Sequence, residues 1–306
     1  SLTAKQLDKY LDTLDKQLTK TLGVWSDNYR EQLSEIFADC YEFEKQSLVK
    51  AYEVPATAIA TPSNLAALSY VAMAKPLPLT GNTGIPLDDL IKDLNNNEVK
   101  RIKQAVRMGH FEGKTNQQLV QLVRGTRKNK FKDGILQTTT RNAEAIVRTG
   151  VQQVANDARL EIAKQNSDIV IGEQIISVMD SKTSVICRSL DHRIFKVGEG
   201  RRPPFHINCR STFILVIDPK YAGKGNTTQR ASYEGVTENK SYYGWLQTQS
   251  KAFQDDVLGK TRATLLRDGG LNAEQFAKLN LNNNFKPMTL DEMRAKEPLA
   301  FERAGI

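Results

Sequence analysis

The 306-residue sequence is poor in the residues that most often build metal-binding, catalytic or disulfide-linked sites, with 3 cysteines, 3 histidines and 2 tryptophans. So few cysteines do not make a disulfide framework, and they indicate synthesis in a reducing compartment. No run of about 18 apolar residues is present, so no transmembrane helix is predicted. The first residues also lack the basic and apolar regions of a secretory signal peptide.

Nucleotide-binding motifs are missing as well. The sequence contains no GxGxxG motif. Residues 223–228, GKGNTT, follow a predicted strand, but a glycine follows the lysine where a P-loop needs serine or threonine. These absences disfavour the common classes of nucleotide-dependent enzyme.

The composition is that of a hydrophilic protein, with 40% hydrophobic residues and a mean hydropathy of −0.46. The length suggests about two domains of ~150 residues each. The formal net charge of +8 permits a polyanionic partner, but the charges are mostly interspersed, as on an ordinary solvated surface.

Apolar residues at helical spacing dominate the first half of the chain. Five leucines, from Leu7 to Leu22, repeat every three or four residues and predict an amphipathic helix over residues 3–22. We interpret this stripe as packing within its own domain; the alternative is a short coiled-coil seam for a neighbouring subunit. Further helices are predicted at residues 28–53, 63–74, from Pro86, 97–109, 116–124 and 138–165.

A cationic run follows the predicted helix at residues 116–124. It comprises Arg124, Arg127, Lys128, Lys130 and Lys132. Such a run is either a flexible basic linker or a loop that contacts nucleic-acid phosphates. We take these five residues as candidate nucleic-acid-binding residues, with double-stranded DNA as the possible partner.

Residues 180–211 hold two of the three cysteines and two of the three histidines. The pattern predicts a short strand, a turn, a second strand at residues 193–196, a glycine-rich loop and a rigid Pro203-Pro204 entry. A β-rich run at residues 212–217 follows, then an exposed linker at 218–241 and helices at 242–248, 251–267 and 290–297.

The motifs of this stretch resemble those of the Mu F-like minor head proteins of tailed phages, also called head morphogenesis proteins. The matching positions lie in two halves, a D-x-x-T-x-x-x-C-x-x-L-D half and a P-P-x-H-x-N-C-R half. They are Asp180, Thr183, Cys187, Leu190, Asp191, Phe195, Pro203, Pro204, His206, Asn208, Cys209 and Arg210. Ser184 and Ser211 stand where the family pattern has further cysteines, and His192 replaces a glycine. The resemblance extends over residues 135–296.

The resemblance implies an α+β fold with a mostly helical N-terminal region, a long helix packed on a small antiparallel sheet, and a helical C-terminal tail. The expected divisions are 1–134, 135–218 as the Mu F-like domain, and 219–306. It further implies a virion protein of the capsid interior near the portal vertex, made in the host cytoplasm. The expected partners are the portal protein and the major capsid or scaffolding protein, with no membrane.

A structural cluster is expected from the two motif halves, formed by Asp180, Cys187, Asp191, His206, Asn208, Cys209 and Arg210. We expect Arg210 to pair with Asp180 or Asp191. In family members that carry all four cysteines the motifs resemble zinc ligand sets. Because serine replaces two of them here, we expect no cofactor and a metal-free cluster; the alternative is zinc held by Cys187, His206 and Cys209.

Two other functions stay open at this stage. His192, His206 and Asn208 are residue types found in metal-dependent nucleases, but a predicted strand follows where those folds have a helix. We therefore expect a non-enzyme with no catalytic residues. The other alternative is a DNA-binding protein ejected with the genome.

Overall fold

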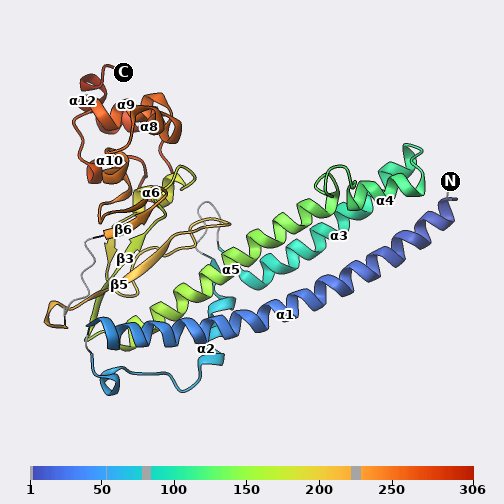
Figure 1. Ribbon diagram of the computed structural model, residues 1–306, viewed down its shortest axis with the longest axis horizontal. Coiled ribbons are helices and arrows are strands. Elements are labelled where there is room, and N and C mark those ends of the chain that lie inside the picture. Colours follow the sequence, from blue (N-terminus) through green and yellow to red (C-terminus); the bar gives the residue numbers. More distant parts are fainter. Residues whose placement is uncertain (1–2, 53, 78–83, 222–228) are drawn as a thin grey trace. The chain divides into compact units, whose positions relative to one another are not determined.

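The computed structural model describes residues 3–52, 54–77, 84–221 and 229–306 (Figure 1). Its helices and small antiparallel sheets give the predicted α+β fold. The chain forms two compact units. Unit 1 groups Ser1–Ala38, Asn64–Leu77 and Gly84–Val154, and unit 2 is built mainly from Asp39–Ser63 and Ala155–Ile306. This grouping does not test the expected domain bounds, which stay a prediction.

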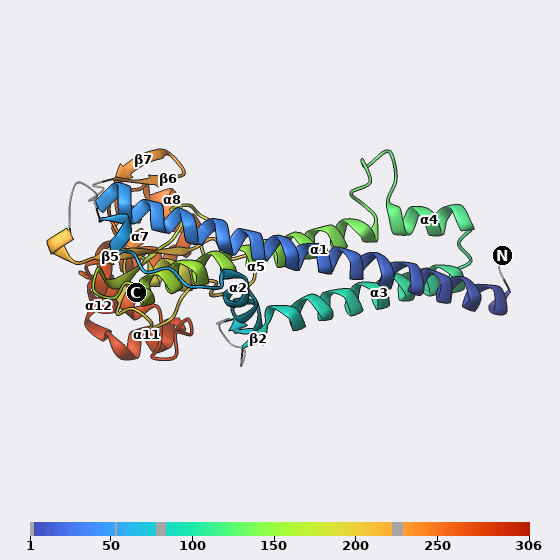
Figure 2. The same ribbon diagram turned by 90° about the horizontal axis from the view of Figure 1, so that it is seen from below.

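Most helices of the first half of the chain are long (Figure 2). They are α1 (Ala4–Tyr52), α2 (Leu65–Ala74), α3 (Leu87–Phe111), α4 (Asn116–Arg124) and α5 (Ile135–Gln165). A short 3₁₀ turn (Ala56–Ala58) and the strand pair β1 (Pro76–Leu77) and β2 (Ile85–Pro86) connect them. None of the described helices is long and apolar enough to cross a membrane.

Two predicted helix breaks are wrong. The helices expected at 3–22 and 28–53 form the single helix α1, and those expected from Pro86 and at 97–109 form the single helix α3. Ser26 of α1 donates to the Leu22 carbonyl and accepts from the Asn95 amide of α3. Tertiary contact therefore holds α1 helical through Gly23, whose intrinsic cost in a helix is about 1 kcal/mol.

The leucine stripe lies in the core of unit 1. Leu7 and Leu11 are buried against Val106 of α3, with Leu14 and Val123 partly buried beside them. Packing within the molecule, which we preferred to a seam for another subunit, is thus confirmed for these two leucines.

Helices α1 and α5 approach closely at a glycine. The Tyr29 hydroxyl of α1 donates to the carbonyl oxygens of Ile146 and Val147 on α5. A Cβ at Gly150 would lie 2.1 Å from that hydroxyl oxygen, so a larger residue here would displace the Tyr29 side chain.

A three-stranded antiparallel sheet forms the centre of unit 2. The central strand β3 (Val170–Ile176) pairs with β4 (Ile194–Phe195) on one side and β5 (Thr212–Ile217) on the other. Arg159 of α5 donates to the Thr212 hydroxyl and the Phe213 carbonyl of β5. The last turns of the long helix therefore pack on the sheet, as predicted.

Two segments of unit 2 differ from expectation. The short strand expected near residue 185 is the helix α6 (Val185–Leu190), which Ser184 caps by accepting from the Cys187 N–H. The expected exposed linker contains a short 3₁₀ turn (Pro219–Tyr221) and a hairpin of β6 (Gln229–Ser232) and β7 (Gly235–Glu238). The failed P-loop motif lies outside the described residues.

The C-terminal tail is helical, as predicted. Its helices are α7 (Tyr242–Leu246), α8 (Lys251–Leu258), α9 (Lys260–Asp268), α10 (Ala273–Leu279), α11 (Leu290–Lys296) and α12 (Pro298–Arg303). They enclose an apolar core that includes Tyr242, Trp245, Phe276 and Phe301. The bond from the Tyr242 hydroxyl to the Asp180 carbonyl attaches this core to the cysteine-bearing stretch.

Candidate functional site

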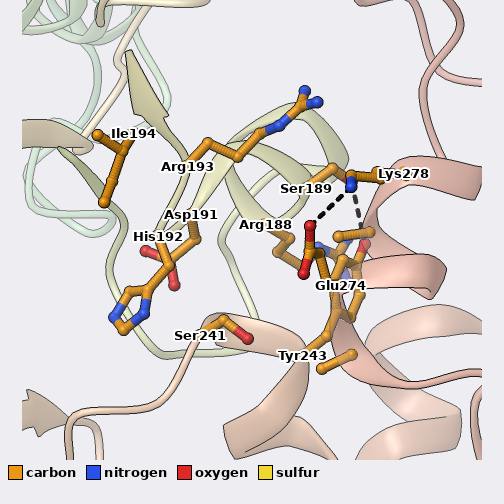
Figure 3. A pocket seen from close by; sticks show the side chains of 12 residues that line it. Arg188, Ser189, Asp191, His192, Arg193, Ile194, Ser241, Tyr243, Glu274 and Lys278 are labelled. Atoms are coloured by element: carbon orange, nitrogen blue, oxygen red, sulfur yellow. Dashed lines mark hydrogen bonds and ion pairs between the residues drawn. The ribbon is translucent and has the colours of Figure 1, made fainter. Parts of the chain in front are cut away.

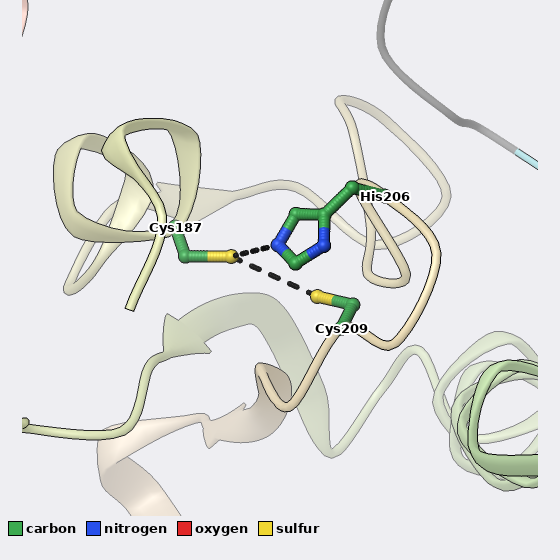
Figure 4. A group of neighbouring side chains, drawn as sticks. All are labelled: Cys187, His206 and Cys209. Carbon is green, nitrogen blue, oxygen red and sulfur yellow. Dashed lines mark hydrogen bonds between the residues drawn. The ribbon is translucent and has the colours of Figure 1, made fainter. Parts of the chain in front are cut away.

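The structure brings two cysteines and a histidine together in unit 2 (Figure 4). Cys187 comes from α6, and His206 and Cys209 come from the turn that precedes β5. Cys187 Sγ lies 3.3 Å from His206 Nε2 and 3.7 Å from Cys209 Sγ. Both cysteines are free thiols, each 2% exposed, and His206 is half-buried.

The side chains of this cluster shift one another's pKa. The hydrogen bond with Cys187 and the bond with His206 hold the pKa of Cys209 below the ordinary value of a thiol, although burial opposes them. The bond to Cys209 raises the pKa of His206. The cluster can therefore hold a thiolate beside a cationic imidazole, which is a strong hydrogen-bonding pair.

Serines hold the backbone around the cysteines. The Ser177 hydroxyl donates to the Cys187 carbonyl and lies 3.0 Å from the Ser211 hydroxyl. Ser184 caps the helix that carries Cys187. These bonds fix α6 against the strand ends without any covalent link.

An ion pair closes the same region. Arg210 donates from both terminal nitrogens to the two carboxylate oxygens of Asp180, at 2.6 and 2.8 Å. Of the two acidic partners considered for Arg210, the structure selects Asp180. Asn208, two residues earlier, occupies a left-handed backbone conformation (φ 62°) in the turn, a conformation that asparagine tolerates better than most residues.

Asp191 belongs to a separate network. Its carboxylate accepts from the backbone N–H groups of Ser177 and Tyr242 and from the Arg230 guanidinium. The side chain is fully buried and joins the residue after β3, the start of α7 and the hairpin strand β6. This carboxylate therefore acts as a structural hydrogen-bond acceptor.

A cavity of about 560 Å³ lies beside this network (Figure 3). Its walls carry Arg188, His192 and the Glu274–Lys278 ion pair. Burial lowers the pKa of His192, which favours the neutral ring, and its Nε2 atom has no hydrogen-bond partner among the described residues. The lining includes neither His206 nor Asn208. The three residues considered for a nuclease are therefore split between this cavity and the cysteine region.

The cationic run forms a closed loop in unit 1 rather than a flexible linker. Asp133 accepts from the backbone N–H and hydroxyl of Thr126 and from the Asn129 amide, and these bonds lower the pKa of Asp133 to about 2. At the base of the loop the backbones of Gly125 and Gly134 touch, since a Cβ on Gly134 would lie 2.2 Å from the Gly125 nitrogen.

The cations of this loop face solvent. The Arg124 guanidinium stacks on the Phe131 ring at 4.6 Å from the ring centre. All five of its cationic residues are exposed: Arg124, Arg127, Lys128, Lys130 and Lys132. The loop is thus a preformed, positively charged surface.

Sequence reasoning missed two buried charge pairs in unit 2. Arg230, the partner of Asp191, lies in a segment whose composition gave no signal for it. Glu173, which pairs with Arg202, is the charged residue of strand β3, whose sequence is VIGEQII. A single carboxylate in a mostly apolar strand indicates that it will be buried and will need a cationic partner from another segment of the chain.

Comparison with known families agrees with the motifs. The family described as Phage Mu protein F like protein matches residues 100–214. The match begins earlier than the expected resemblance, inside α3, and ends in β5, so it includes the basic loop, α5 and the Cys187, His206 and Cys209 positions. No curated protein and no solved structure matches the chain. Residues 100–214 are thus similar to the family described as Phage Mu protein F like protein.

Proposed function

We propose that this protein is a minor head protein of a tailed phage that binds the portal protein through its helical surfaces during head assembly. The family match over residues 100–214 is the observation that carries the proposal. In this proposal the protein lies in the capsid interior near the portal vertex. The major capsid and scaffolding proteins are the alternative partners.

Exposed apolar side chains on α3 and α4 support a protein-binding role. Met108 and Phe111 in the last turn of α3 are 63% and 79% exposed, and Val120 of α4 is 55% exposed. Large apolar side chains gathered near one helix connection are typical of protein–protein contact sites. Other large apolar side chains of unit 1, such as Tyr70 and Val71, are also exposed, but Phe111 is the most exposed of those that the structure describes. We therefore take this corner as the docking surface of unit 1.

Replacing Met108 and Phe111 by Asp tests the proposal. Because both side chains are largely exposed, the double variant is expected to fold normally and to lose at least tenfold in portal binding, roughly the 1.4 kcal/mol that corresponds to a tenfold change. Portal binding is measured with purified proteins, and incorporation is measured by mass spectrometry of purified particles.

Val236→Asp is the matched control, since Val236 is 74% exposed on the hairpin of unit 2. It is expected to leave portal binding unchanged. Incorporation of the double variant at the normal level would overturn the assignment of this surface. Absence of the normal protein from particles would overturn the minor head function itself.

A second function is favoured by the closed basic loop, namely sequence-independent contact with double-stranded DNA during packaging or ejection. A preformed cationic loop loses less conformational freedom on binding phosphates than a flexible one does. The metal-dependent nuclease alternative has weaker support, because His192 and His206 lie in different sites. Cleavage of phage DNA by the purified protein with a divalent metal would support the nuclease instead.

A further inference from the structure

We propose that Cys187, His206 and Cys209 bind a zinc ion. This proposal replaces the sequence-based expectation of a metal-free cluster. It does not depend on the portal-binding function, because it rests on the geometry of three side chains. Their ligand atoms all lie within 4.8 Å of one another, and each comes from a buried or half-buried residue (Figure 4).

The distances between the ligand atoms fit one tetrahedral ion. Zn–S bonds of about 2.3 Å and Zn–N bonds of about 2.05 Å at tetrahedral angles place two sulfurs about 3.8 Å apart and a sulfur and a nitrogen about 3.6 Å apart. The Cys187 and Cys209 sulfurs are 3.7 Å apart, and Cys187 Sγ is 3.3 Å from His206 Nε2. A shift of a few tenths of an ångström in the imidazole would complete the fit.

The second nitrogen of His206 is held as metal-binding histidines require. His206 Nδ1 lies 2.9 Å from the Ile207 carbonyl oxygen and donates to it. This bond fixes the ring orientation and directs Nε2 at the two sulfurs, leaving that nitrogen to coordinate once it has lost its proton. Metal-ligating histidines almost always donate their other N–H in this way.

The chemistry of the ligands selects the metal. Two thiolates and one imidazole form a soft set, which prefers zinc to calcium or magnesium. Three protein ligands leave a fourth tetrahedral position for water or another oxygen donor. The Ser184 and Ser211 hydroxyls both contact the Cys187 thiol.

The ion would join α6 to the turn that precedes β5. The Asp180–Arg210 ion pair already joins the stretch before α6 to this turn, and Ser177, which donates to the Cys187 carbonyl of α6, contacts Ser211. Binding to the folded chain alone would stabilise the fold by linkage. In this proposal the ion has a structural role, holding α6 against the turn that precedes β5.

The first measurement is the zinc content of the full chain, purified under reducing conditions after zinc supplementation and dialysis. Elemental analysis is expected to give one zinc per chain. Titration with Co²⁺ is expected to give the intense thiolate-to-cobalt absorption of a tetrahedral site. A chelator should lower the melting temperature, and added Zn²⁺ should restore it.

Variants assign the ion to the three residues. Cys187→Ser and Cys209→Ser are each expected to abolish stoichiometric zinc and the cobalt absorption. Cys40→Ser is the matched control, because Cys40 lies on α1 and outside the cluster. This variant should retain one zinc per chain.

A variant that binds zinc more tightly provides a test that misfolding cannot explain. Ser184 lies three residues before Cys187 and contacts its thiol, so Ser184→Cys creates a C-x-x-C pair whose thiolates can both reach one ion. This variant is expected to bind zinc at least tenfold more tightly than the natural chain. Ser250→Cys, at the corresponding capping position of α8, should leave zinc affinity unchanged.

The proposal is overturned if the reduced, zinc-supplemented chain contains no stoichiometric zinc and gives no cobalt–thiolate absorption. It is also overturned if Cys187→Ser and Cys209→Ser retain zinc at the level of Cys40→Ser.

Discussion

The contrast between two aspartates shows what single residues contribute to unit 2. Asp180 and Asp191 both belong to the motif, and each accepts bonds from one arginine. The Asp180–Arg210 pair remains partly exposed, with 41% of the arginine side chain in contact with solvent. The Asp191–Arg230 pair is almost completely buried, with exposures of 0% and 9%. Burial makes the second pair more sensitive to loss of one partner.

Asp191→Ala is expected to lower the free energy of unfolding by about 3–5 kcal/mol, because it leaves a buried guanidinium unpaired. The backbone N–H groups of Ser177 and Tyr242 lose an acceptor as well. Asp180→Ala, the matched change at the more exposed pair, is expected to cost about 1 kcal/mol. Urea denaturation followed by tryptophan fluorescence measures both losses. Equal losses would contradict the dependence on burial.

Among the elements, α3 and α5 are joined by a buried carboxylate. Glu98 of α3 is 3% exposed and accepts from Arg101 and from Thr139 and Asn142 of α5. Burial alone would raise the pKa of Glu98, but the three hydrogen bonds, with that from Asn142 first, outweigh it and lower the pKa. The ionised form is therefore the one that holds the two helices.

Stability from Glu98 is expected to depend on pH. A carboxyl with a lowered folded-state pKa stabilises the fold above its unfolded value, about 4.3 for glutamate, and this contribution is lost as the pH falls through the folded-state pKa. Glu98→Gln should therefore be less stable than the natural chain at neutral pH, and the difference should shrink in acid. A difference that stays constant on acidification would show that ionisation of Glu98 does not stabilise unit 1.

The basic loop between α4 and α5 acts as one element. Replacing its five cationic residues by Gln is expected to weaken DNA binding equally for all sequences, because loop contacts to phosphates do not read bases. Five phosphate contacts would give a salt slope of about −4.5, and three to five contacts are expected. Fluorescence anisotropy at several salt concentrations measures affinity and slope together.

An equal loss of charge elsewhere provides the control for this experiment. Five exposed lysines of α1 and α3 serve for it: Lys5, Lys9, Lys16, Lys20 and Lys92. Their replacement by Gln should change DNA affinity less than the loop replacement does. Equal effects of the two sets would mean that the net charge of +8, rather than the loop, attracts DNA.

For the whole molecule, the family match and the compact units divide the chain differently. The match over residues 100–214 takes its first part, through Val154, from unit 1 and the remainder from unit 2. The aromatic core around Trp245 lies after the match. The matched region thus carries the Cys187, His206 and Cys209 cluster and the basic loop, while the Met108 and Phe111 surface falls at its beginning.

The local features of this protein could be predicted from its sequence alone. The helix predicted at residues 116–124 is α4, and the β-branched run located β5. The two motif halves singled out Cys187, His206 and Cys209. Such signals come from residues a few positions apart or from a family motif. They can be recognised without knowing the tertiary structure.

The contacts between distant groups depended on tertiary packing. It joined the two predicted N-terminal helices into α1, because Asn95 of α3 binds Ser26 at the expected break. It gave Asp191 to Arg230, 39 residues away, and left Asp180 for Arg210. It also placed the two sulfurs and the imidazole at distances that fit one ion. These outcomes depend on how the elements pack, and local propensity carries no information about packing between segments far apart in the chain.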